Sequence, residues 1–352
     1  MKKTSYIIFL FCLLSFNLKG QSVDDFKYNW ESEDQLQSSR KGLDSLKLIN
    51  VLVSLDDQDL FQFAYIRADN LGNLVGYDFN KERVIYFHQE DYSVVREITD
   101  GNGRGPREMK LVRDIEFDKK GNMWIIDLEG GKITKWSKEN ELLKSFKPKK
   151  KYTRPYRIAL CENSISILSE QYLGEGLYHK FDLEGNEQNS FMTLKNNNKD
   201  EFRLWTDASY FRGDLTCSNE KIYHVGRYKN YIRKYDKNGE LLFSKKVIEF
   251  EGNPEPLLEL GNRSSRRKDE VKTISGQIEV LDNSLLVSFS GKRNPYFYIL
   301  DIYDLNGNYK ISYQFNHPTK EFTTDGKFIY TLETHRNDKK QYIAKYRLPV
   351  FD

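Results

Sequence analysis

Hydrophobic and polar residues alternate over short stretches of this chain, and the pattern is clearest between Asp114 and Phe146. There, Ile115 and Phe117 alternate with polar residues, and an apolar run follows the Gly-Asn pair at 121–122. Short stretches of period-two patterning joined by tight turns indicate an antiparallel β-meander. The predicted strands cover residues 115–117, 123–126, 133–136 and 142–146.

The same unit recurs along the chain. A shift of 49 positions superposes Gly72 on Gly121 and Asp78 on Asp127. The aromatic residue that ends the third predicted strand marks six copies, at Phe87, Trp136, Phe181, Tyr235, Tyr303 and Tyr346. Repeats of this size, with variation in length confined to insertions, are typical of folds in which each unit packs against its neighbours. Six four-stranded units therefore predict an all-β closed ring.

One turn follows the marker residue in three of the copies. Phe181, Tyr235 and Tyr303 each precede an Asp, and a Gly follows that Asp three positions later. An Asp side chain accepts hydrogen bonds from the backbone of its own turn, and Gly tolerates a positive φ. The spacing therefore predicts a hairpin between the third and fourth strands of these units.

The two ends of the chain suggest how the ring closes. Residues 1–20 place Lys2 and Lys3 before an apolar core, as secretory signal peptides do, and residues 21–45 are polar with no strong strand signal. Large residues before Cys12 disfavour a lipid anchor at that thiol. A strand is predicted at 46–55, whereas the last unit lacks a fourth strand. We therefore expect residues 46–55 to complete the last unit and close the ring.

Charge and cysteine content refine this interpretation. Cleavage of the signal peptide removes three lysines and leaves 52 basic and 52 acidic residues, so the overall charge gives no reason to expect nucleic acid as a partner. Cys161 and Cys217 remain in the mature chain. Their positions on neighbouring innermost strands differ by about one residue, which turns the side chains apart. Two free thiols are therefore expected, and no disulfide.

The first two copies resemble the NHL-type repeats of six-bladed β-propellers, on the stretches 73–78, 122–127 and 83–87. The run 101–108 also resembles a Gly-rich turn of secreted six-bladed propellers from Bacteroidetes-type bacteria, with Arg107 where a third Gly is usual. The resemblance covers residues 46–352. It implies a single-domain six-bladed β-propeller, exported to the periplasm or the cell exterior. Most members of that group have no assigned activity, so little function is inherited.

In such a ring the loops between blades open on one face, and here they carry the excess length. The predicted loops cover residues 100–113, 147–157, 195–213, 249–276 and 316–320. They are rich in cationic and aromatic residues. Guanidinium groups beside aromatic rings suit a carboxylate, phosphate or sulfate group on a sugar or a peptide, although solvated loop charges are an alternative interpretation. The candidate binding residues are Arg104, Arg107, Lys151, Tyr152, Arg154, Arg203, Trp205 and Tyr210.

Polar residues near the starts of the inner strands are expected at the ring axis. Asp114, Arg157 and Asp214 form this set, either as a site or as a salt-bridged plug, and the plug is favoured. The five histidines show no metal-ligand spacing, and no nucleophile-elbow or phosphate-loop motif occurs. The sequence therefore assigns no catalytic residue and no metal ligand.

Two classes of function are consistent with these features. The first is a non-enzymatic binding or scaffold module of the bacterial cell envelope, without a cofactor, whose partner is an envelope protein, a peptide or an anionic glycan. A subunit that docks on membrane machinery, as TolB-type propellers do, is a variant of it. The alternative is a metal-dependent hydrolase or lyase similar to lactonases and NHL-type lyases, with Ca²⁺ or Zn²⁺ at the axis. A monomer without a transmembrane segment after signal cleavage is expected in each case.

Overall fold

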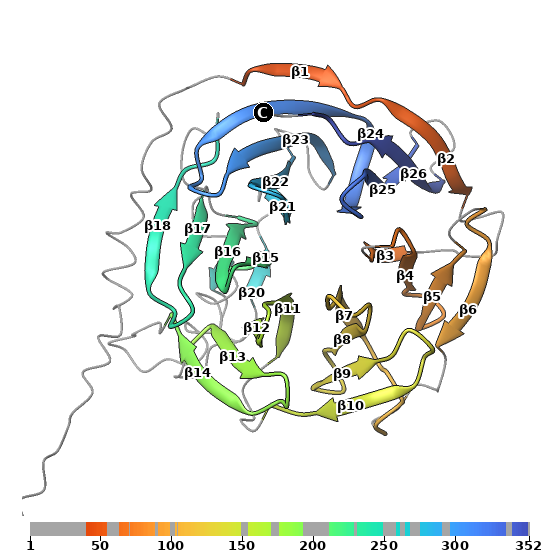
Figure 1. Ribbon diagram of the computed structural model, residues 1–352, viewed down its shortest axis with the longest axis vertical. Helices are drawn as coiled ribbons and strands as arrows, with labels where there is room; N and C mark the ends of the chain where they lie inside the picture. Colours follow the sequence, from red (N-terminus) through yellow and green to blue (C-terminus); the bar gives the residue numbers. More distant parts are fainter. Residues whose placement is uncertain are drawn as a thin grey trace, which may run out of the picture.

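The computed structural model is a ring of β-sheets arranged around a central axis (Figure 1). The residues that the structure describes are 40–54, 63–69, 71–88, 91–98, 103, 105–148, 154–169, 176–192, 211–228, 231–248, 258–260, 265–267, 275–290, 296–335 and 340–350. For 258–260 and 265–267 it describes the backbone alone. The predicted signal peptide and most of the predicted polar segment lie outside these ranges.

Four blades are separate four-stranded antiparallel sheets whose strands follow one another from the axis outward. The first contains β3 (Phe63–Ala68), β4 (Leu74–Asp78), β5 (Arg83–Phe87) and β6 (Val94–Ile98). The second contains β7 (Val112–Phe117), β8 (Met123–Asp127), β9 (Lys132–Trp136) and β10 (Leu142–Phe146). The third contains β11 (Pro155–Leu160), β12 (Ser164–Ser169), β13 (Tyr178–Asp182) and β14 (Glu187–Phe191). The fourth contains β15 (Gly213–Ser218), β16 (Lys221–Gly226), β17 (Ile232–Tyr235) and β18 (Leu241–Lys245).

The fifth and sixth blades share one long strand. The fifth contains β21 (Ser275–Leu281), β22 (Ser284–Phe289), β23 (Phe297–Asp304) and the first part of β24 (Tyr309–Thr324). The rest of β24 pairs with β25 (Phe328–Thr334), which pairs with β26 (Gln341–Arg347). Residues 316–320, predicted as a loop between blades, are therefore extended strand, because the chain changes partner here without leaving the sheet. A short hairpin of β19 (Leu258–Leu260) and β20 (Ser265–Arg267) precedes β21.

The ring closes as the sequence predicts. Strand β2 (Leu48–Ser54) pairs antiparallel with β26, from Leu48 opposite Tyr346 to Ser54 opposite Tyr342, and supplies the fourth strand of the last blade. The inner strands β3, β7, β11, β15, β21 and β24 contact one another in cyclic order, and β24 contacts β3. Val53 packs in one buried cluster with Phe63 and Ile66, so the closing strand also helps to seal the interface between the last and first blades.

An additional strand precedes the closing strand, within the segment for which no strand was predicted. Strand β1 (Gly42–Ser45) runs parallel to β24 along the outside of the fifth blade. Just before it, the buried guanidinium of Arg40 forms an ion pair of 2.9 Å with Asp301 and donates to the Ile248 carbonyl oxygen at 3.1 Å. The sequence of this segment has little strand propensity of its own, so these long-range contacts hold it in place.

The repeated positions have the structural roles expected from the sequence. All six marker aromatics are buried: Phe87, Trp136, Phe181, Tyr235, Tyr303 and Tyr346. In each of the three predicted hairpins one Asp oxygen accepts two backbone N–H groups; for Asp304 these belong to Asn306 and Asn308, each at 2.8 Å. The following Gly307 has a φ of 74°, which favours glycine. The hairpin prediction is confirmed.

Cys161 and Cys217 form a disulfide, so the prediction of free thiols was wrong. Cys161, directly after β11, is bonded to Cys217 in β15, with their Cα atoms 5.3 Å apart. The one-residue offset between the two positions is real, but its consequence is the opposite of the one expected. Ala159 and Cys161 lie on the face of the third blade that packs against the fourth, whereas Leu215 and Cys217 lie on the face of the fourth blade that packs against the third. Opposite faces of neighbouring blades meet in one interface, so both thiols lie there.

Candidate functional site

The axis of the ring is lined by a network of buried charges. Arg67 of β3 is 4% exposed, and its guanidinium lies 2.9 Å from Asp114 and 3.2 Å from Glu116, both on β7. On the other side it lies 3.4 Å from Glu321 of β24. One arginine therefore connects the inner strands of the sixth, first and second blades.

The three axial residues singled out from the sequence meet in the same network. Arg157 of β11 forms ion pairs with Asp214 of β15 at 3.1 Å and with Asp114 of β7 at 3.7 Å. Asp114 also accepts the backbone N–H of Ile158 at 3.0 Å, and Asp214 accepts that of Ile278 at 3.1 Å. Each aspartate thus joins its own inner strand to that of the next blade. This geometry is that of a salt-bridged plug.

Carboxylates outnumber guanidinium groups along this axis. Burial raises the pKa of Asp214 to about 6, although Arg157 and Arg67 lower it. Burial also raises the pKa of Glu116 to about 8 and that of Glu279 to about 7, again against the effect of Arg67. The network therefore depends on Arg67 for charge compensation. The sequence contains a signal for this role of Arg67. The 49-residue shift between the first two blades aligns Arg67 with Glu116, so an arginine and a glutamate occupy the same position on neighbouring inner strands.

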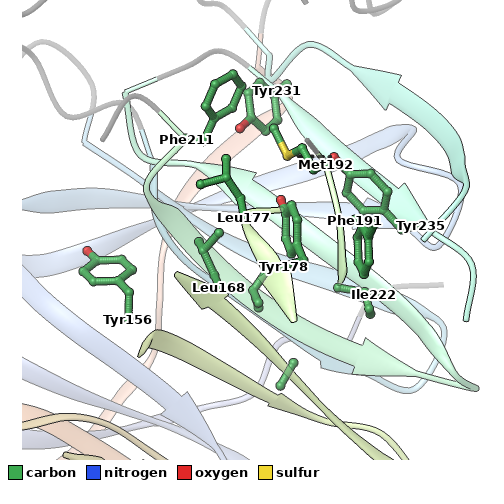
Figure 2. Packing of buried hydrophobic residues seen from close by; sticks show 12 residues of the cluster. Tyr156, Leu168, Leu177, Tyr178, Phe191, Met192, Phe211, Ile222, Tyr231 and Tyr235 are labelled. Carbon is green, nitrogen blue, oxygen red and sulfur yellow. Dashed lines mark hydrogen bonds between the residues drawn. The ribbon is translucent and has the colours of Figure 1, made fainter. Parts of the chain in front are cut away.

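A second group of charges surrounds Tyr156 at the start of β11. The guanidinium carbons of Arg113, Arg157 and Arg212 lie 4.5, 5.0 and 5.8 Å from the centre of its ring. Arg227 donates a long hydrogen bond of 3.4 Å to its hydroxyl. Tyr156 is 1% exposed, whereas Arg113, Arg212 and Arg227 are half-buried. Figure 2 shows the Tyr156 ring at the edge of the aromatic cluster that fills the interface of the third and fourth blades.

These four arginines lie at one end of the ring. Arg113 and Arg212 stand at the beginnings of inner strands, and Arg227 follows the second strand of its blade. Loops between blades and loops after second strands open on the same face, because the strands of each blade alternate in direction. We call Arg113, Arg157, Arg212 and Arg227 with Tyr156 the arginine mouth. It lies on the face on which the sequence placed the binding loops.

The charges of the arginine mouth change the acidity of its central residue. Burial by itself would raise the pKa of the Tyr156 hydroxyl, but the positive charges of Arg227, Arg157, Arg113 and Arg212 outweigh burial and lower the pKa to about 8. Within the part of the chain that the structure describes, Arg113 and Arg227 have no carboxylate within 4.0 Å. The mouth is therefore locally positive, although the mature chain is expected to be neutral.

The loop residues predicted to bind a ligand are only partly described. Arg107 and Arg154 are exposed, and the guanidinium of Arg107 lies 5.3 Å from the ring centre of Trp136. The other six predicted residues lie outside the described residues: Arg104, Lys151, Tyr152, Arg203, Trp205 and Tyr210. Arg212 and Arg227 were not predicted as binding residues, because neither shows a distinctive spacing in the sequence. Only their place on the same face relates them to Tyr156.

Histidines separated in sequence approach one another elsewhere on the ring. Among the described residues, His317, Glu333 and His335 form the one group in which three possible metal-ligand atoms lie within 4.8 Å of one another. No spacing in the sequence marks this group, because the pairing of β24 with β25 brings its members together. The side chain of His88 is 46% exposed beside Asp91, as in a surface residue, and His179 is buried beside Glu187, as in a packing residue.

No protein-family profile matches the chain, and no curated protein matches it in sequence. Among the described residues no helix is long and apolar enough to cross a membrane. Several solved structures share the fold. A Bacteroides fragilis protein thought to be exported is 14% identical, with a TM-score of 0.56 over 90% of this chain and 99% of that one.

Two further solved structures are similar to this chain over most of its length. Virginiamycin B lyase from Staphylococcus aureus, with quinupristin bound to an inactive variant, is 12% identical, with a TM-score of 0.50 over 82% of this chain and 80% of that one. The β-propeller domain of Cps50 (Swd1) from Myceliophteria thermophila is 10% identical, with a TM-score of 0.50 over 85% and 99% of the two chains. At these identities the similarity shows the fold, which is a β-propeller.

Proposed function

We propose that this protein is a non-enzymatic binding module of the bacterial cell envelope, and that the arginine mouth binds an anionic group of its ligand. The observation that carries the proposal is the set of four guanidinium groups around one buried tyrosine, of which Arg113 and Arg227 have no carboxylate partner among the described residues. Guanidinium groups bind carboxylate, phosphate and sulfate through paired, charge-assisted hydrogen bonds.

The partly buried position of the mouth supports this use. Charges interact more strongly where water is excluded, and Arg113, Arg212 and Arg227 are half-buried beside an aromatic wall. Holding like charges together costs free energy, and an incoming anion removes that cost. The exposed Arg107 and Arg154 on the same face suit contacts to the remainder of a larger ligand, such as an acidic peptide or an anionic glycan.

An envelope location is supported by independent features. The Cys161–Cys217 disulfide is consistent with folding outside the cytoplasm. The similar protein from Bacteroides fragilis is thought to be exported, and the first twenty residues have the pattern of a signal peptide. We therefore place the protein in the periplasm or on the cell exterior.

A metal-dependent hydrolase or lyase with an axial site is the alternative, and it has less support. Asp114 and Asp214 are bound to Arg67, Arg157 and backbone N–H groups, so both carboxylates are engaged in holding neighbouring blades together. Among the residues that the structure describes, neither aspartate belongs to a group with the geometry to bind a metal. Axial chemistry would require these ion pairs to break.

The test uses three classes of anionic probe: a sulfated oligosaccharide, a uronic-acid oligosaccharide and a polyglutamate peptide. Binding would be measured by calorimetry at low salt for the protein and for the double variant Arg113→Gln/Arg227→Gln. Each charge-assisted hydrogen bond contributes about 1.5–3 kcal/mol, so we expect at least about a 100-fold loss of affinity in the double variant.

The matched control is Arg347→Gln, an exposed arginine where β26 ends, on the opposite face of the ring. It should bind like the unmodified protein. The proposal is contradicted if no probe binds, if the double variant binds as well as the unmodified protein, or if the control loses as much affinity as the double variant.

A further inference from the structure

The place where β24 passes from the fifth blade to the sixth brings together two histidines and a glutamate. His317 lies in β24 at this crossing, while Glu333 lies near the end of β25 and His335 directly follows that strand. The pairing of Thr319 with Glu333 sets the register that brings the two strands together here. As a result, one ligand atom from each of the three side chains lies within 4.8 Å of the others.

Glu333 is oriented by the protein toward the histidines. Its side chain is fully buried, and one carboxylate oxygen, Oε1, accepts hydrogen bonds from the Thr331 hydroxyl at 2.8 Å and from the Tyr346 hydroxyl. The other oxygen, Oε2, accepts no hydrogen bond from the described residues and lies 3.5 Å from Nε2 of His335. A positive partner at this position stabilises the ionised carboxylate, since burying an uncompensated charge is costly.

The two imidazole rings form the open side of the cluster. They are stacked with centroids 3.9 Å apart, and His335 stacks in turn on Tyr342 at 4.1 Å. Both histidines are half-buried; the side chain of His335 is 22% exposed. Solvent therefore reaches part of each ring, whereas Nε2 of His335, which faces Glu333, is buried, and the carboxylate approaches from the protein interior.

We propose that His317, Glu333 and His335 bind one divalent transition-metal ion, with Zn²⁺ as the first candidate, and leave one coordination position open to water or ligand. Two imidazoles and a carboxylate suit zinc and its neighbours in the transition series, and hard cations prefer all-oxygen sites. Bonds of about 2.1 Å in a tetrahedral arrangement place ligand atoms about 3.4 Å apart. The two rings are stacked with an angle of 21° between their planes, so both must also turn until a nitrogen lone pair of each points at the ion. The carboxylate stays fixed by Thr331 and Tyr346.

Thr331 and Tyr346 have a separate role in this site, because they touch the carboxylate and not the metal. Partners of this kind hold a ligand in its binding orientation, and their loss commonly lowers metal affinity about 10-fold to 100-fold. The metal site lies on the fifth and sixth blades, whereas the arginine mouth lies on the second, third and fourth. The inference therefore stands independently of the proposed anion binding.

The experiment uses tag-free, chelator-treated protein with its disulfide intact. Zinc binding is measured by calorimetry, and cobalt binding by the visible absorption of the Co²⁺ ion, which reports nitrogen and oxygen ligands directly. We expect one ion per chain. The affinity for zinc should be at least about 100-fold lower in His317→Gln and in His335→Gln, since each variant loses one residue that binds the ion directly. Thr331→Val should bind about 10-fold more weakly and keep a similar cobalt spectrum.

The matched control is His88→Gln, which removes a half-exposed histidine on the first blade and should leave metal affinity unchanged. Thermal melting of each variant without metal identifies any variant that fails to fold. The test needs no variant at the buried Glu333, because the two histidine variants each remove one proposed ligand. The proposal is overturned if zinc binds only at millimolar concentration, if both histidine variants keep full affinity, or if His88→Gln loses as much affinity as they do.

Discussion

Replacing Arg67 with methionine removes the cation that compensates the axial carboxylates and keeps most of the side-chain volume. Its guanidinium contacts Asp114, Glu116 and Glu321 at 2.9, 3.2 and 3.4 Å, and it is 4% exposed. Removing one partner of a buried ion pair typically costs about 3–5 kcal/mol, because the remaining charge stays buried and unpaired. We expect the Arg67→Met variant to lose stability in this range near neutral pH, or about 6–10 °C in melting temperature.

The pH dependence of this loss follows from the sign of the pKa changes. Without Arg67 the folded-state pKa values of Glu116 and its neighbours rise further, so the folded protein binds more protons than the unfolded chain. The stabilisation by those protons is present in acid and is lost as the pH rises through the folded pKa. The difference between the variant and the unmodified protein should therefore be largest above about pH 8 and should shrink toward about pH 5.

The assay is urea denaturation, followed by tryptophan fluorescence, at about pH 8 and at about pH 5. The dependence of the free energy of unfolding on urea concentration is compared between the variant and the unmodified protein. Lys119→Met serves as the control, because Lys119 and Glu162 form an ion pair with 79% and 63% of their side chains exposed, and such pairs contribute little. A loss below about 1 kcal/mol at both pH values, or a loss of equal size at both, would refute the argument that Arg67 compensates buried carboxylates.

Three further outcomes follow from the structure. Replacing Cys161 with Ser opens a disulfide with a sequence separation of 56 residues, and should lower stability by about 4 kcal/mol; equal denaturation midpoints with and without reductant would contradict this. A chain that begins at Arg40 should fold normally, whereas one that begins after Ser54 lacks β1 and the closing strand and should melt far lower; equal melting curves would disprove the closure. The ultraviolet absorbance of phenolate should titrate near pH 8 in the unmodified protein and not in Tyr156→Phe. Because this pKa is lowered on folding, Tyr156 should add stability as the pH rises from about 8 to about 10, and a Tyr156→Phe protein with the same pH profile would exclude that contribution.

The repeat pattern predicted the fold because each blade is a local structure. Gly-containing turns, alternating strands and a buried aromatic residue such as Trp136 are set within about forty residues, so they can be identified one unit at a time. Closure could also be predicted, since a missing fourth strand at one end and an extra strand at the other leave two edges that must pair. Asn316 and Pro318 mark the boundary between the fifth and sixth blades in the sequence, but they predicted a loop there and not the unbroken strand β24.

The candidate sites were harder to predict. The approach of Asp114, Arg157 and Asp214 to the axis followed from their place on inner strands, but Arg67 was missed although it occupies the position of Glu116 in the first blade. The disulfide was missed because the two cysteines were compared as if their strands lay in one sheet, whereas opposite faces of neighbouring blades meet in one interface. The histidine cluster depends on the register between two strands of neighbouring blades.

The sequence by itself determined that this chain forms a ring of six four-stranded β-blades with an N-terminal strand closing the last one. Those properties depend on hydrophobic periodicity and turn chemistry, which act over a few residues. Only the tertiary structure decided which charges meet: Arg67 with three carboxylates, four arginines around Tyr156, and two histidines beside Glu333. The physical reason is that Coulomb interactions and metal binding depend on distances of a few ångströms in space, and the closure of the ring sets those distances between residues far apart in the chain.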